Sequence, residues 1–170
     1  MASQKSSASK NAKSTAPVRK QKQSKKRIDK KTALRSVDLA VTRQLALFLD
    51  NRPGTLAKVC ETLANAGISI YAISTSDTVD HSVVRLVVSD PYQALRIMER
   101  QDVLVVQNDV LMLEGLNRPG SLASIARALA EGGVNIEYAY CATDPNSERG
   151  LMILRPSDIP KALQVLNGAI

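Results

Sequence analysis

A six-residue motif occurs twice in this chain of 170 residues, and the second copy begins 66 residues after the first. Residues 51–56 read NRPGTL and residues 117–122 read NRPGSL, so five of the six positions are identical. The likeness continues without a gap at Ala57/Ala123, Leu63/Leu129, Ala64/Ala130, Gly67/Gly133 and Ile70/Ile136, and the register shifts by two after about residue 74. Because a repeated sequence folds into a repeated structural unit, we predict two copies of one unit, over residues 43–109 and 110–170.

Each unit is predicted to begin with a strand, a loop and a helix. Residues 44–50 alternate leucine with other residues, which is the two-residue period of a strand. After the loop, apolar residues spaced by three and four positions predict a helix with one buried face that ends at Gly67. These positions are Leu56, Val59, Cys60, Leu63 and Ala64 in the first copy and Leu122, Ile125, Ala126, Leu129 and Ala130 in the second, which ends at Gly133.

Two strands and a second helix are predicted to follow in each unit. Runs rich in Ile and Val, at 68–75 and 83–88 and again at 134–142 and 150–155, predict two hairpins. Asp90 before Pro91 predicts the start of the second helix, and Ser157 or Asp158 is its expected cap in the second unit. The resulting order is βαββαβ, an α+β fold of two ferredoxin-like units, each an antiparallel sheet with helices on one face.

The second unit is short of its last strand. Residues 103–106 supply a fourth strand to the first unit, but only four residues follow Leu166 at the end of the chain. In this topology the last strand lies beside the first one, so we expect the edge of strand 110–116 to be open. Open edges are usually covered, and we therefore expect a homodimer in which another chain pairs there.

The charge of the chain divides into two parts. Residues 1–36 carry twelve Lys and Arg against one acid, Asp29, whereas the remainder has 11 basic and 15 acidic residues. The same segment contains few apolar residues, too few to offset the conformational entropy that a chain loses when it becomes ordered. We therefore expect residues 1–40 to be a disordered basic arm. Two interpretations of residues 1–36 stay open: a solubilising tail, or weak non-specific contact with nucleic-acid phosphates, for which residues 21–31 (QKQSKKRIDKK) have the charge density.

Several classes of protein are disfavoured by the composition. A single His and two Cys argue against a metal site, a disulfide scaffold or a metal cofactor. Apolar runs are far shorter than the roughly 20 residues of a membrane span, and no secretory signal is visible, so we expect a cytoplasmic protein with no membrane partner. A Ser-His-Asp arrangement would have to use His81 in a predicted turn. We therefore expect no catalytic residues, no cofactor and no enzymatic activity.

The repeated loop has the chemistry of a carboxylate site. Pro53 and Pro119 preset the backbone, and Gly54 and Gly120 allow it to approach a ligand closely. The amides that follow are unpaired donors of a helix start, and an Asn amide can orient either end of an amino acid. A plain tight turn between strand and helix is the alternative interpretation of the same residues.

The order of strand, NRPG-x-L loop, helix ending in Gly and Ile/Val-rich strand resembles the ACT domain, a small-molecule-binding regulatory module of amino-acid metabolism. The resemblance covers both units and is closest to free-standing tandem ACT proteins with no attached enzyme. It implies an amino-acid ligand, a regulatory role, and a binding site at the interface of paired units. The alternative function is a nucleic-acid-associated protein that uses the basic arm, with the ACT pair as its dimerisation or regulatory body.

The second unit is similar to the serine-sensing ACT domain of phosphoglycerate dehydrogenases, through residues 117–120 (NRPG) and 133–136 (GVNI). The resemblance implies that the loop Asn and the amides near the helix start hold the ligand, while Asn135 reaches it across a pair of domains. A histidine of that branch is replaced by Leu49 and Gly115, so the identity of the amino acid stays open. The candidate ligand-binding residues are Asn51, Pro53, Gly54, Thr55, Leu56 and Ser69 in the first unit, and Asn117, Pro119, Gly120, Ser121, Leu122 and Asn135 in the second.

Other polar and aromatic residues have plainer interpretations. Tyr138 and Tyr140 project to one side of a predicted strand, where they either line a pocket or close the core between helices and sheet. Arg52 and Arg118 in the loops either guide an anion or are plain solvated charges, and we favour the second interpretation. Cys60 lies on a predicted buried face.

Overall fold

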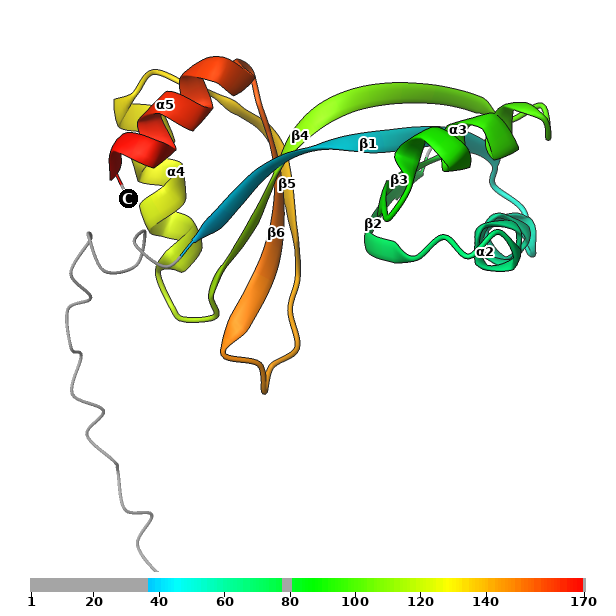
Figure 1. Ribbon diagram of the computed structural model, residues 1–170, viewed down its shortest axis with the longest axis horizontal. Helices are drawn as coiled ribbons and strands as arrows, with labels where there is room; N and C mark the ends of the chain where they lie inside the picture. Colours follow the sequence, from blue (N-terminus) through cyan, green and yellow to red (C-terminus); the bar gives the residue numbers. More distant parts are fainter. Residues whose placement is uncertain (1–36, 78–80, 170) are drawn as a thin grey trace, which may run out of the picture.

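The computed structural model describes residues 37–77 and 81–169, so nearly all of the predicted basic arm lies outside the described residues (Figure 1). The elements are β1 (Asp38–Asp50), α2 (Thr55–Asn65), β2 (Ile70–Asp77), β3 (His81–Val88), α3 (Pro91–Glu99), β4 (Leu104–Leu116), α4 (Ser121–Glu131), β5 (Ile136–Ala142), β6 (Arg149–Pro156) and α5 (Ile159–Ala169). None of the helices in these ranges is long and apolar enough to cross a membrane.

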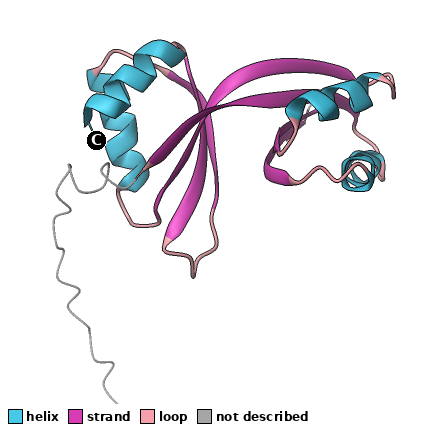
Figure 2. Ribbon diagram, in the orientation of Figure 1, coloured by secondary structure: helices cyan, strands magenta, loops and turns pink. Residues whose placement is uncertain are grey.

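The strands, magenta in Figure 2, form one antiparallel sheet. Their order in the sheet is β2-β3-β1-β4-β6-β5. Helices α2 and α3 pack on one half of the sheet and α4 and α5 on the other. The predicted α+β fold of two ferredoxin-like units is thereby confirmed.

The predicted helix starts are confirmed by side-chain caps. The Asp90 carboxylate accepts a hydrogen bond from the Gln93 amide at 2.8 Å, with Pro91 in the first turn of α3. In the second unit, Asp158 rather than Ser157 caps α5, because its Oδ1 accepts from the Lys161 amide at 2.9 Å. A short polar side chain just before a helix satisfies one of its unpaired amides.

Strands β1 and β4 are shared between the two units. The second half of β4 begins the second unit, while its first half is the fourth strand of the first unit. The first half of β1 lies beside the second half of β4, with Asp38 opposite Glu114 and Thr42 opposite Val110. Residues 38–43 therefore occupy the place of the strand that the second unit lacks.

This pairing corrects two expectations. The edge of residues 110–116 is not open, because β1 covers one side and β6 the other. The first strand begins at Asp38 instead of residue 44, so residues 38–40 of the predicted arm belong to the sheet. The physical reason is that Val37 and Leu39 pack on the core under α4 and α5, which an argument from local charge does not reveal.

Three apolar clusters hold the fold together. One lies between the sheet and α2/α3, and a second lies between the sheet and α4/α5. The third is on the opposite face of the sheet, where Ala72, Val87, Val110 and Ile153 are buried together. Strands β2 and β5, at opposite ends of the strand order, touch each other, so the sheet bends along β1 and β4 until its two halves meet (Figure 1).

Candidate functional site

Both repeated loops lead into helices that lack a side-chain cap. The residues before α2 and α4 are Gly54 and Gly120, with φ of 90° and 95°. This left-handed conformation favours glycine, which explains the Gly of the motif. Among the described residues no side chain accepts from the first amides of either helix. The Thr55 and Ser121 amides donate to the carbonyl oxygens of Arg52 and Arg118 at 3.3 and 3.2 Å, so the amides that follow, at residues 56–57 and 122–123, remain donors for an anion.

At the first loop these donors border a pocket of about 380 Å³, which we call the loop pocket. It brings together the end of β1, the loop, the start of α2, and residues of β2 and β3. Its lining residues are Leu49, Asp50, Asn51, Arg52, Thr55, Leu56, Thr75, Ser82 and Val84. Three of the predicted ligand-binding residues, Asn51, Thr55 and Leu56, thus share one cavity, whereas Ser69 is not among its lining residues.

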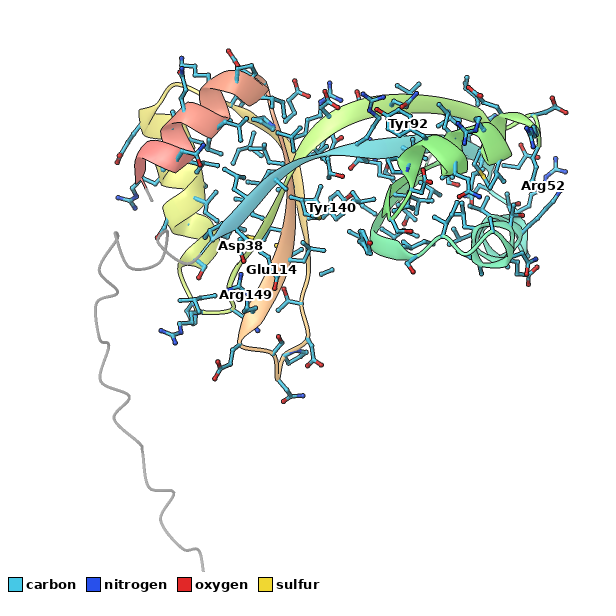
Figure 3. All side chains as sticks on the ribbon, in the orientation of Figure 1. Asp38, Arg52, Tyr92, Glu114, Tyr140 and Arg149 are labelled. Atoms are coloured by element: carbon cyan, nitrogen blue, oxygen red, sulfur yellow. The ribbon has the colours of Figure 1, made fainter. Side chains whose placement is uncertain are left out.

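The loop pocket contains both signs of charge. Arg52 Nε lies 4.0 Å from Asp50 Oδ2, and the two side chains are 80% and 59% exposed (Figure 3). Such an exposed, long ion pair contributes little to stability. Both charges are therefore available to a ligand that carries the opposite ones.

The second loop is fastened to the β5–β6 hairpin. The Asn117 side chain donates hydrogen bonds to the carbonyl oxygens of Asp144 at 3.2 Å and Ser147 at 2.9 Å. Ser121 Oγ donates to the Leu116 carbonyl at 2.7 Å. Asn117 therefore uses both of its amide donors on the protein, whereas Asn51 has no side-chain hydrogen bond within residues 37–77 and 81–169. The matching hairpin tip, residues 78–80, lies outside those ranges.

Ser69 and Asn135 occupy equivalent places between a helix and the following strand. The Ser69 amide donates to Ser89 Oγ at 3.0 Å, and the Asn135 amide donates to Ser157 Oγ at 3.2 Å. Both residues are exposed. The structure does not bring either of them to the loop pocket, so their predicted role needs a second unit or a second chain.

Three polar pocket residues were missed by the sequence analysis: Asp50, Thr75 and Ser82. Asp50 stands next to the motif, whereas Ser82 faces Leu49 only because β3 pairs with β1 in this register. The sequence signal that could have identified these residues is their position at strand ends, because side chains at the ends of neighbouring antiparallel strands meet at one edge of the sheet. Using it requires knowing which strands are neighbours.

Tyr138 and Tyr140 close neither of the helix-covered cores. The Gln44 side chain, fully buried, donates through Nε2 to Tyr138 Oη at 2.6 Å and accepts at Oε1 from Tyr140 Oη at 2.9 Å. Arg85 lies 5.1 Å above the Tyr138 ring. Burial, followed by the neighbouring Tyr138, raises the pKa of the Tyr140 hydroxyl, so this group stays protonated. The tyrosines thus join the two halves of the sheet at their contact.

The fold and the site together define a class of protein, in which two ferredoxin-like units are paired and a small polar pocket lies at the start of an uncapped helix. A family model described as an ACT domain pair matches residues 40–168. The chain belongs to the ACT domain pair family, and ACT domains are regulatory domains that bind amino acids.

Solved structures agree with this family. Protein BT0572 from Bacteroides thetaiotaomicron is 32% identical with a TM-score of 0.71, and the match covers 76% of this chain and 89% of that one. The regulatory subunit of aspartate kinase from Thermus flavus is 25% identical with a TM-score of 0.56, over 79% and 96% of the two chains. The ligand-free regulatory subunit of aspartate kinase from Thermus thermophilus, at 23% identity and a TM-score of 0.60 over 81% and 99%, shares the fold. A search of curated proteins gave no match.

Proposed function

We propose that this protein is a cytoplasmic, non-catalytic sensor that binds a free amino acid in the loop pocket and regulates a separate protein. The observation that carries the proposal is the pocket itself, in which uncapped helix amides, an acid and a base border one cavity. The likeness to a regulatory subunit of aspartate kinase supports a regulatory role beside an enzyme subunit.

The ligand's groups have distinct places in this proposal. The α-carboxylate lies at the start of α2, at the Leu56 amide and beside Thr55, with Arg52 nearby, because a helix start and a guanidinium both attract an anion. The α-ammonium group lies at Asp50, and Asn51 orients the ligand by donating or accepting. The ligand side chain rests on the apolar walls formed by Leu49 and Val84. Pro53 and Gly54 shape the loop.

In the second unit, ligand binding is proposed only where a further unit or a second chain completes the site. Asn117, Pro119, Gly120, Ser121, Leu122 and Asn135 carry the motif, but Asn117 is bound to the hairpin. A ligand held there by Asn117 would have to displace the Asp144 and Ser147 carbonyls. We therefore place the first binding event at the loop pocket.

The test is the thermal unfolding midpoint of the full chain with each of the twenty amino acids at millimolar concentration. A ligand at 100 times its dissociation constant stabilises by about 2.7 kcal/mol, which raises the midpoint by several degrees. We expect one or a few amino acids to do so, and Asn51→Ala and Asp50→Asn to lose most of the response. Asn117→Ala is the matched control and should keep it. No response to any amino acid, or one that both pocket variants keep in full, contradicts the proposal.

A homodimer remains part of the proposal, at a different edge from the one first expected. Among the described residues, the outer side of β4 from residue 104 to 109 pairs with no strand. Phe48, Leu104 and Val106, which we call the edge patch, are 39%, 64% and 44% exposed there. An open edge with exposed apolar side chains is a template for pairing with a second copy.

A further inference from the structure

A second cavity of about 380 Å³ lies on the face of the sheet opposite α4 and α5, and we call it the sheet pocket. Its floor is apolar, because Ala40, Met112 and Leu151 project from β1, β4 and β6 to the same side. The pairing explains this position: Ala40 lies opposite Met112, and Leu151 lies opposite Glu114, two residues along β4. It shares no residue with the loop pocket.

One wall of the sheet pocket comes from the other half of the sheet. Tyr71 lies where the pairing of β2 with β3 shifts between Ile70 and Ala72, and such a bulge redirects a side chain out of the regular alternation. The Tyr71 side chain is 51% exposed although it borders the cavity. An aromatic side chain therefore borders the cavity without being buried in the core.

The rim of the sheet pocket is negatively charged. Asp38 and Glu114 lie opposite each other, and one Arg149 guanidinium holds both: its Nε donates to Glu114 Oε1 at 2.9 Å and its Nη2 donates to Asp38 Oδ2 (Figure 3). Within the described part of the chain these two carboxylates share one cation, so a negative charge is in excess there. Among the described residues, Asp38 Oδ1 and Glu114 Oε2 have no partner and remain acceptors.

The equivalent place in the other unit shows that the fold does not require these residues. There Phe48 lies opposite Leu104, at the repeat positions of Glu114 and Asp38. Glu137, bonded to Arg155 at 2.6 Å, stands at the repeat position of Tyr71. The same sheet position therefore tolerates a wholly apolar rim. The acidic rim and the aromatic wall are particular to the sheet pocket.

We propose that the sheet pocket binds a small organic amine that has an apolar body and no carboxylate. The apolar body covers Ala40, Met112 and Leu151, and the ammonium group lies between the free oxygens of Asp38 and Glu114. The Tyr71 ring offers its face to the same cation. A carboxylate on the ligand would be repelled by the rim, which separates this ligand class from the free amino acids of the loop pocket. The inference does not depend on the proposed function.

The test is a titration of the full chain, labelled with ¹³C at the methionine methyl groups, with 2-phenylethylamine. The Met112 methyl reports on the pocket floor, and the fully buried Met98 in the core under α2 and α3 is an internal control. We expect a saturable shift of Met112 alone, and no shift with 3-phenylpropanoate, which has a similar size and the opposite charge.

Variants separate binding in the pocket from general attraction to a charged surface. Tyr71→Ala and Glu114→Gln should each weaken binding about two- to fivefold, the scale of one cation–π or ionic contact at a partly exposed site. Asp109→Asn removes a carboxylate that pairs with Arg43 at 3.8 Å elsewhere and should change nothing. A variant that disturbs folding would also move Met98, whereas Tyr71→Ala removes only an exposed side chain. The inference is overturned by an unmoved Met112, by an equal shift with 3-phenylpropanoate, or by binding that both pocket variants retain.

Discussion

At the scale of single residues, the repeat shows that one motif position performs two tasks. Asn51 borders the loop pocket, and Asn117 holds the β5–β6 hairpin through two carbonyl oxygens. We predict that Asn117→Ala lowers the free energy of unfolding by about 1 kcal/mol, the usual net value of such hydrogen bonds. Asn51→Ala should stay within about 0.5 kcal/mol of the parent chain, as exposed substitutions usually do. Urea unfolding of both variants without ligand measures the difference, and equal losses would contradict these separate roles.

Gln44 is the other residue whose environment decides its role. Its position in the repeat corresponds to Val110, yet its amide is the partner of both Tyr138 and Tyr140 hydroxyls. Gln44→Leu leaves two partly buried hydroxyl groups without that partner, and we predict a loss of about 1–3 kcal/mol in the free energy of unfolding. Gln164→Leu, at an exposed position on α5, is the matched control and should lose less than about 0.5 kcal/mol. A neutral Gln44→Leu would show that apolar packing alone joins the halves.

At the scale of elements, β1 ties the two units together. Leu39 precedes the first unit in sequence but packs on the core of the second, under α4 and α5. We predict that Leu39→Ala lowers the free energy of unfolding by about 2 kcal/mol, at the low end for a buried leucine because Leu39 is only partly buried. Hydrogen exchange should speed up first in β6 and α5. Val41→Ala, 46% exposed on the same strand, should have little effect. Faster exchange confined to β2 and β3 would contradict the assignment of this strand segment to the second unit.

The elements also show what the sequence could and could not predict. Alternation and helical spacing predicted the strands, the helices and the caps, because these depend on neighbours a few residues away. The sequence grouped Asn51, Thr55 and Leu56 for the same reason, since one local motif carries them to one cavity, while their role in ligand binding stays a prediction. Ser82 and Thr75 reach the loop pocket through strand pairing, and residues 38–43 reach the second unit across the whole chain. Such long-range pairing leaves no local pattern.

At the scale of the whole molecule, sharing β1 and β4 moves the open edges of the sheet. Each shared strand is paired on both sides along part of its length. Among the described residues, 38–43 and 104–109 are therefore open edges in addition to the outer sides of β2 and β5 at the two ends of the strand order. The edges at 38–43 and 104–109 differ in chemistry: Asp38 is tied to Arg149 at the first, and the apolar edge patch lies at the second. Unpaired backbone groups beside apolar side chains favour association, and the edge patch groups three such side chains, so we place the proposed dimer at β4 and test β2 as the alternative.

Leu104→Lys tests this placement of the interface. A lysine on the edge strand opposes pairing by placing charge between the two copies, so we expect the dimer dissociation constant to rise at least about tenfold. Sedimentation velocity over a range of protein concentrations measures it. Ile73→Lys is the matched control, because Ile73 is 44% exposed on β2, at the other end of the strand order, and should leave association unchanged. If Ile73→Lys dissociates the dimer and Leu104→Lys does not, the interface lies on β2. The second copy then pairs with the strand that carries Tyr71, the residue that forms one wall of the sheet pocket.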